Sequence, residues 1–167
     1  MAHHPASPFH FRRGPSTATT APRSAAVRAA LSPLGTPRAQ ALLRELALSG
    51  APVPEVVLDT ASTVTGVLVT LHEVETNRAA AGGVYTVRDD ATVEVVGAWS
   101  SSSATAGLRR RVLWELEAEA RRRGFSQAVA TATLEDDQLS VLVAAGYTST
   151  RHDAAGEPAR GKSLTRR

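Results

Sequence analysis

The hydrophobic pattern of the chain changes period several times, and each change marks a predicted element. Apolar residues recur at helical spacing between Thr36 and Gly50, with a threonine and a proline at the start and a glycine at the end. This arrangement is typical of a capped helix. A second helical stripe covers 107–123, again followed by a glycine, and a shorter helix is predicted over 136–145. A helix of about ten residues is also predicted just before Pro33.

Runs with a period of two, rich in valine and threonine, predict the strands. Residues 55–61 and 64–75 flank a Ser–Thr pair, which indicates an antiparallel hairpin, and the glycine-rich 77–83 is expected to be a flexible link. Further strands are expected at 8–14, 84–90, 91–100 and 127–134, from Tyr147 onwards, and near 162–165. Within 91–100, strict alternation would place Glu94, Val96, Ala98 and Ser100 on one face, and Val93, Val95, Gly97 and Trp99 on the other.

Composition excludes several classes of function. With 43% apolar residues, the 167-residue chain can bury its own core, and one domain is expected over 8–167 after a flexible start at 1–7. The chain has no cysteine, which excludes disulfides, thiolate nucleophiles and cysteine metal sites. Its five histidines are scattered, so no metal site is expected. No apolar run approaches the roughly 20 residues that a bilayer requires, so no membrane partner is expected.

Charge is unevenly distributed along the chain. Residues 1–50 carry six arginines and one glutamate, 51–107 two arginines and seven acids, and 108–167 eleven basic and eight acidic residues. A basic end beside an acidic middle suits one anionic and one cationic ligand, whereas a net charge of only +3 gives little support for nucleic-acid binding. No apolar stretch follows Arg12 and Arg13, so a cytoplasmic bacterial protein is expected, with a transit peptide as the alternative.

Three arginines, Arg109, Arg110 and Arg111, lie in the first turn of the long predicted helix. The helix dipole is positive there, so each cation costs about 0.3–1 kcal/mol at an exposed site. A bound polyanion would offset that cost, with the serines of 100–103 and the backbone at Gly107 as further contacts. A solvated arginine cluster is the alternative that the sequence leaves open.

The predicted order of elements, β-α-α-β-β-β-α-β-α-β-β, resembles that of the GNAT superfamily of acyl-CoA-dependent N-acyltransferases. Residues 9–31 resemble the opening strand and helix of that family, and Trp99 to Gly124 resembles its acyl-CoA loop and helix. LEDDQLSVLVAAGY, residues 134–147, is similar to its short helix ending in Gly-Phe or Gly-Tyr. The resemblance implies an α/β (α+β) fold with a mixed, mostly antiparallel sheet of about six or seven strands and about four helices. The sheet would splay between the strand ending near Ser100 and the strand beginning near Gln127.

The resemblance also implies where acetyl-CoA would bind. Backbone N–H groups near Ala98–Ser100 would polarise the acyl carbonyl, and the following loop would hold the pyrophosphate. The implied cofactor-binding residues are Ala98, Trp99, Ser100, Ala104, Thr105, Ala106, Gly107, Leu108, Arg109 and Arg110.

Three positions depart from the family's pattern. Aligned on Gly107, the chain has Ala104 where Arg or Gln is usual and Arg109 where Gly or Ala is usual. Leu142 stands where many members have the tyrosine that protonates the departing thiolate. We therefore expect a degenerate loop and slow acyl transfer. Trp114 is expected to pack in the core rather than stack on a base.

An amine that attacks a thioester must first lose a proton, which requires a base. Glu94 is the best candidate because it lies on the strand that enters the cofactor loop, and a solvent-facing strand glutamate is the alternative. His72, Glu73 and Glu75 form a second candidate group. Tyr147 is a candidate proton donor, although packing is the more usual role of a tyrosine after a helix-ending glycine.

The sequence thus predicts an N-acyltransferase that moves an acetyl group from acetyl-CoA to a primary amine of a small molecule or protein. A catalytically silent module of the same fold, binding acyl-CoA or a protein partner, is the alternative. A small nucleic-acid-binding protein is a third reading, but the chain lacks interleaved aromatics and a known binding motif. The acceptor amine stays open, as does the choice between a monomer and a homodimer.

Overall fold

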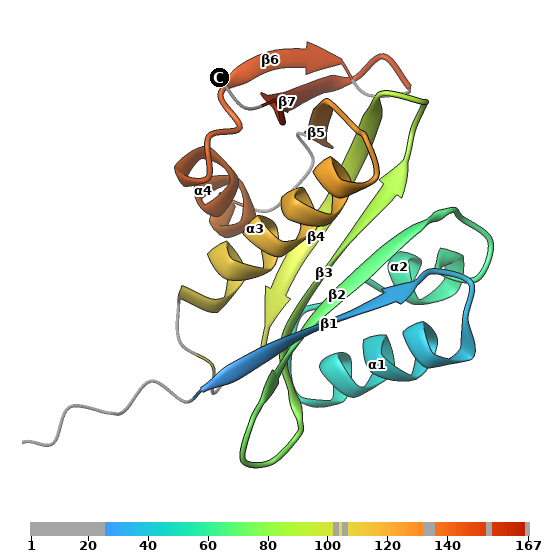
Figure 1. The fold of residues 1–167 in the computed structure, drawn as a ribbon, viewed down its shortest axis with the longest axis vertical. Helices are drawn as coiled ribbons and strands as arrows, with labels where there is room; N and C mark the ends of the chain where they lie inside the picture. The colour runs from blue at the N-terminus through green and yellow to red at the C-terminus, as the bar shows by residue number, and fades with distance from the viewer. Residues whose placement is uncertain (1–25, 102–103, 105–106, 132–135, 153–154, 166–167) are drawn as a thin grey trace, which may run out of the picture.

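The computed structural model describes residues 26–101, 104, 107–131, 136–152 and 155–165. They form one seven-stranded sheet in the order β1-β2-β3-β4-β5-β7-β6 (Figure 1). Neighbouring strands are antiparallel except β4 and β5, which are parallel. The elements are β1 (Val27–Pro33), α1 (Pro37–Leu48), α2 (Glu55–Thr60), β2 (Gly66–Glu73), β3 (Ala79–Val87), β4 (Thr92–Ser100), α3 (Gly107–Arg122), β5 (Gln127–Thr131), α4 (Asp136–Ala144), β6 (Ser149–His152) and β7 (Pro158–Ser163).

The predicted fold class is confirmed. The structure also has the predicted sequence of element types, but in its first part other segments form them: the first strand lies where a helix was predicted, and the second helix lies where a strand was predicted. The strand expected at 8–14 and residues 132–134 of the strand expected at 127–134 lie outside the described residues. The strand expected from Tyr147 begins at Ser149, and the one expected near 162–165 is β7. None of the described helices is long and apolar enough to cross a bilayer.

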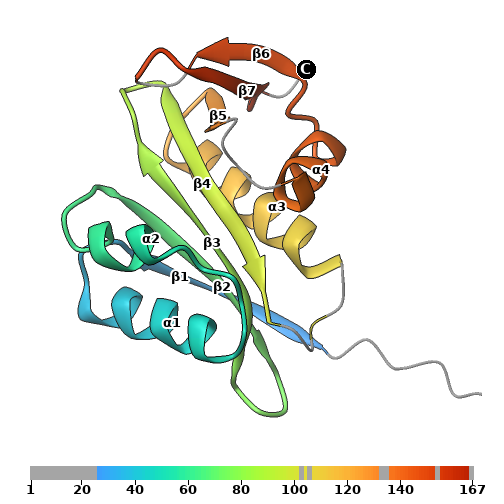
Figure 2. The same cartoon turned by 180° about the vertical axis from the view of Figure 1, so that it is seen from behind.

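Helices cover both faces of the sheet, and each pair packs over its own apolar cluster. In Figure 1 α3 and α4 lie in front of the sheet, and in Figure 2 α1 and α2 do. Leu116 of α3 and Leu142 of α4 share a cluster with valines of β2 and β4. Leu43 and Leu46 of α1 share a second cluster with Val57 of α2. The helical stripes predicted in the sequence are therefore the faces that α1 and α3 bury.

The segment before Pro33 is a strand, and the predicted helix there is wrong. Its seven residues pair in continuous register with β2, from Val27 opposite Glu73 to Pro33 opposite Val67. Alanine, leucine and arginine favour a helix locally, but this preference is weak and tertiary pairing overrides it. Because β1 is an edge strand, it also tolerates Pro33, which has no N–H to donate.

The predicted strand at 55–61 is the short helix α2, so the predicted hairpin with 64–75 is also wrong. Only Val57 of α2 is buried, whereas the adjacent Val56 is 63% exposed. One buried side chain per turn suits a short helix lying against α1. The two sides of β2 are taken by β1 and β3 instead.

The glycine-rich segment predicted as a flexible link belongs to β3. Its small residues are required by packing, because helices press on both faces of this strand. A Cβ on Gly82 would lie 2.4 Å from Leu46 Cδ1 of α1, and one on Gly83 would lie 2.5 Å from Val112 Cγ1 of α3. The two glycines therefore let α1 and α3 pack closely against the sheet, and the segment is an ordered strand and not a flexible link.

A β-bulge in β4 overturns the strict alternation predicted for 91–100. Val84 pairs with Gly97 and Tyr85 with Val95, which leaves Val96 as an extra residue. Before the bulge, Val93 and Val95 pack in the cluster under α3; after it, Ala98 packs there too, while Val96 and Trp99 pack in the cluster under α1. The Ala98 side chain therefore lies on the same face as Val95, and not on the face of Glu94 as predicted.

The two parallel strands part after the bulge. The pairing of β4 with β5 runs from Thr92 opposite Gln127 to Val95 opposite Ala130, and among the described residues β4 continues to Ser100 along β3 alone. The helix α3 crosses between the two strands (Figure 2). The predicted splay and its crossover helix are thus present.

Replacing Gly83 with alanine should destabilise the fold by about 1–3 kcal/mol, because the new Cβ overpacks the contact between β3 and α3. Besides Val112, this Cβ would approach the Gly97 carbonyl oxygen to 2.7 Å, and that backbone group cannot move aside cheaply. Gly107→Ala is the matched control, since a Cβ at Gly107 meets no atom of the described part of the chain within 4 Å. Urea unfolding of both variants measures the difference, and equal stabilities would contradict the packing argument.

Candidate active site

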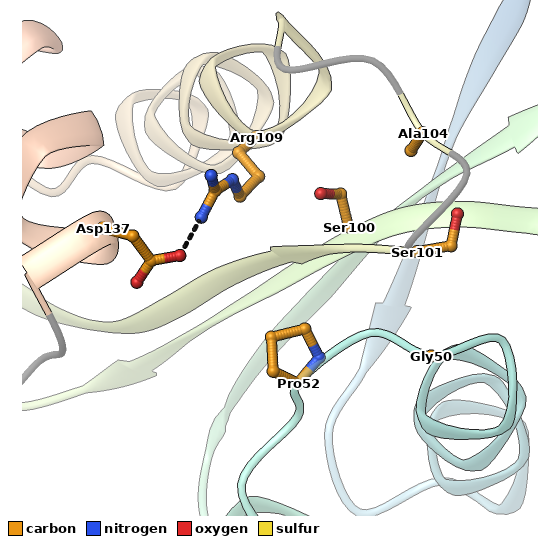
Figure 3. Close-up of a pocket in the computed structure, with 7 residues that line it drawn as sticks. All are labelled: Gly50, Pro52, Ser100, Ser101, Ala104, Arg109 and Asp137. Carbon is orange, nitrogen blue, oxygen red and sulfur yellow. Dashed lines mark hydrogen bonds and ion pairs between the residues drawn. The ribbon is translucent and has the colours of Figure 1, made fainter.

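A cavity of about 350 Å³ lies at the end of β4, between Pro52 and the ion-paired Arg109 and Asp137 (Figure 3). Its wall comes from five places in the chain: the loop after α1, the end of β4, the loop between β4 and α3, the first turn of α3 and the first turn of α4. The lining residues are Gly50, Pro52, Ser100, Ser101, Ala104, Arg109 and Asp137. Three of them, Ser100, Ala104 and Arg109, were predicted from the sequence as cofactor residues.

Arg109 and Asp137 form an ion pair across this cavity. The Nη1 of Arg109 donates to Oδ2 of Asp137 at 2.7 Å, joining α3 to α4 (Figure 3). The Arg109 side chain is 21% exposed, and its Nε is buried without a hydrogen-bond partner among the described residues. A buried donor without a partner, placed beside a cavity, can donate a hydrogen bond to a ligand oxygen without giving up another partner.

The other two arginines of the first turn have different surroundings. Arg111 approaches Glu115 at 3.8 Å, whereas Arg110 has no ion-pair partner within the described part of the chain. Arg110, Arg111 and Gly107 border a shallow recess beside Trp114. Trp114 is 60% exposed, so the prediction that it packs in the core is wrong.

Gln138, one residue after Asp137, reaches from α4 to the backbone of β4. Its Oε1 accepts a hydrogen bond from the Ala98 N–H at 3.3 Å, and both residues are buried. Sequence reasoning missed this residue. The one signal for it was its position a helical turn before Leu142, on the same face of α4. Leu142 itself is buried in the core.

Glu94 lies on β4 before the strands part, opposite Thr86 of β3 and Val129 of β5. Its side chain is half-buried. Glu94 alternates with Val93 and Val95, whose side chains pack under α3. The bulge returns Ala98 to that same face, so the Glu94 side chain projects from the face opposite the Ala98 side chain. The predicted base therefore projects from one face of β4, whereas the Ala98 N–H lies in the plane of the sheet and donates to Gln138.

Tyr147 is fully buried, and its hydroxyl has no hydrogen-bond partner among the described residues. Burial raises the pKa of Tyr147 well above its usual value, and the nearby Glu117 carboxylate raises it further. Glu117 in turn accepts bonds of 2.8 and 2.9 Å from Lys162 Nζ, which lies 5.7 Å from the centroid of the Tyr147 ring. A tyrosine in these surroundings holds its proton strongly, and it does not line the cavity.

The remaining predicted residues are distributed around the site. Trp99 packs in the cluster under α1, and Leu108 packs at the edge of the core. Thr105 and Ala106 lie outside the described residues. In the second candidate group, His72 is buried and bonds to Thr70 Oγ1 at 2.9 Å and to the Asn77 carbonyl at 3.2 Å.

No protein-family model and no curated protein matches the chain. Solved structures do match its fold. They include a GNAT-family acetyltransferase from Staphylococcus aureus (TM-score 0.62, 7% identity, 84% of this chain and 100% of that one). An Escherichia coli GNAT-family N-acetyltransferase in complex with CoA matches with a TM-score of 0.57, at 14% identity over 84% of this chain and 83% of its own. A GNAT-family acetyltransferase from Elizabethkingia anophelis with acetyl-CoA bound matches with a TM-score of 0.53, at 17% identity over 81% of this chain and 94% of its own. The chain thus has the GNAT fold.

The free energy of unfolding should fall above about pH 10, because Tyr147 ionises more readily in the unfolded state. The folded pKa of Tyr147 lies above the unfolded value, so the unfolded state releases its proton first and stability is lost as pH rises. The loss approaches about 1.4 kcal/mol per pH unit for this one group. Tyr147→Phe removes an unpaired buried hydroxyl, so it should be at least as stable as the natural protein at neutral pH and should lose less above pH 10. Urea unfolding of the natural protein and the variant, at neutral pH and above pH 10, measures the difference. An equal loss of stability with pH in the two proteins would contradict the argument.

Proposed function

We propose that this protein is an acyl-CoA-dependent N-acyltransferase that moves an acetyl group from acetyl-CoA to a primary amine. The observation that carries the proposal is the parting of β4 from β5 after Val95, with the cavity and the first turn of α3 at the open end. Solved proteins of the same fold that hold CoA or acetyl-CoA support it at the level of the fold.

The residues at the start of α3 fit a pyrophosphate. A Cβ at Gly107 would meet none of the described residues within 4 Å, so they leave the backbone there open to a ligand. The first-turn N–H groups of this 16-residue helix and its dipole favour an anion. Arg109, with its unpaired Nε, and Arg110 add positive charge. A bound anion at this end would explain three arginines where the helix dipole alone disfavours them.

The Ala98 N–H is the group that would receive the acyl oxygen. Acetyl-CoA supplies a thioester whose carbonyl carbon the amine attacks, forming a C–N bond as the C–S bond breaks and the thiolate leaves. The Ala98 N–H, fixed in β4, would stabilise the negative charge that develops on that oxygen. Glu94 would remove the proton from the amine, through a water because its side chain projects from the other face of β4.

Leu142 has no proton to donate, and Tyr147 is buried with a raised pKa. The thiolate must therefore leave unassisted or take a proton from water, which predicts a modest rate. The competing proposal is a catalytically silent module that binds acyl-CoA. It is favoured by the same Leu142 and by the engagement of the Ala98 N–H with Gln138.

CoA affinity should fall when the α3 end of the site is altered. Arg109→Ala removes a phosphate contact, and a charged hydrogen bond is worth about 1.5–3 kcal/mol, so the loss should be about tenfold or more. Gly107→Val should also weaken binding, because its side chain would occupy the space where the backbone meets the ligand. Arg122→Ala, at the other end of the same helix, is the control. Calorimetry with CoA measures all three, and unchanged affinity in both site variants would contradict the assignment.

Glu94→Gln should lower the steady-state rate of acetyl transfer by about 10²–10⁴-fold, since it removes the base that prepares the amine. Tyr147→Phe should retain most of the rate, because the buried hydroxyl takes no part. Both are measured against a panel of amines with acetyl-CoA. Full activity in Glu94→Gln, or a larger loss in Tyr147→Phe, would reverse the ranking, and absence of turnover in a natural protein that binds CoA would favour the silent module.

A further inference from the structure

Two consecutive residues of α4 hold the groups that the proposed function assigns to acetyl-CoA. Asp137 pairs with the Arg109 guanidinium at 2.7 Å, and Gln138 accepts the hydrogen bond of the Ala98 N–H at 3.3 Å. The first group would bind phosphate and the second would bind the acyl carbonyl. In the free protein, α4 thus occupies both ends of the acyl-donor site.

The contact of Gln138 has the chemistry of the acyl group itself. Its acceptor is a carbonyl oxygen, presented to the N–H of a strand that, within the described part of the chain, has no β5 partner beyond Val95. A backbone N–H donates one strong hydrogen bond, so Gln138 and a thioester carbonyl compete for it. At 3.3 Å the bond is longer than the usual 2.7–3.2 Å of an N–H···O bond, which favours its exchange.

The surroundings of Gln138 suit this role. Only 6% of the residue is exposed, so its carboxamide competes inside a largely dry site where water is a poor substitute. Asp137, in contrast, is 52% exposed in its side chain, and its bond to Arg109 is open to exchange with a phosphate. The two contacts are adjacent in the chain but act on chemically different parts of one ligand.

We propose that Gln138 is a specificity-determining residue: its carboxamide oxygen takes the place of the acyl carbonyl at Ala98, and an acyl thioester binds by displacing it. This inference rests on the proposed function. Since CoA has no acyl carbonyl, Gln138 sets the difference in affinity between acetyl-CoA and CoA. Asp137 competes for Arg109 with the phosphates, which both ligands share. After transfer, return of Gln138 to the Ala98 N–H promotes release of the acylated amine.

The test is calorimetry of acetyl-CoA and CoA with the full chain and three variants. In Gln138→Ala the Ala98 N–H has no protein acceptor before the ligand arrives, so the acyl carbonyl gains a whole hydrogen bond instead of exchanging one. Acetyl-CoA should then bind roughly 3- to 10-fold more tightly, with CoA little changed. Asp137→Asn should raise the affinities for acetyl-CoA and CoA by a factor equal for the two ligands, because both carry the phosphates. Val143→Ala, on the exposed face of α4, is the control and should change neither.

Each outcome decides between the proposals. A higher ratio of acetyl-CoA to CoA affinity in Gln138→Ala alone supports the inference, and thermal unfolding of that variant confirms that it is folded. If the natural protein binds both ligands and Gln138→Ala leaves their ratio unchanged, Gln138 is only a packing residue and the inference is overturned while the proposed function stands. If neither ligand binds the natural protein or the variants, the proposed function itself is overturned.

Discussion

The parting of two parallel strands imposes the main physical demand on this protein. Where β4 extends beyond its pairing with β5, none of the described strands pairs with that side of it, and a buried N–H without an acceptor is costly. The free protein meets the demand at Ala98 with the side chain of Gln138 from α4. A ligand carbonyl could meet it equally well, and this equivalence links the architecture of the sheet to the proposed chemistry.

The rest of the fold supports that opening. The bulge at Val96 turns Ala98 toward the face covered by α3 and α4 and leaves Glu94 on the other face. Two glycines of β3 let helices pack closely on both sides of the sheet, which holds β3, and through it β4, in place. A strand that keeps one neighbour through its whole length can lose the other locally without losing its position.

Electrostatics at the opening are arranged around α3. Its first turn carries three arginines against the helix dipole, and two of them are compensated by carboxylates, Asp137 and Glu115. Its last turn carries Arg121 and Arg122, which agree with the dipole and pair with buried glutamates of the same helix. The ion pairs of the last turn are thus internal to α3, whereas the pair of Arg109 with Asp137 joins α3 to α4 at the end that faces the cavity.

The sequence by itself determined the helices with a full amphipathic stripe and local end signals, since period and capping act over neighbouring residues: 36–50 and 107–123 correspond to α1 and α3. The resemblance of one motif in the sequence also named Ser100, Ala104 and Arg109, which follow one another along a strand, loop and helix and line the cavity. Tertiary structure alone decided that 27–33 is a strand and 55–60 a helix, because pairing with β2 and packing against α1 outweigh weak local preferences. It alone brought Pro52, Asp137 and Gln138 to the site, because their proximity depends on how distant elements pack and leaves no periodic trace in the chain.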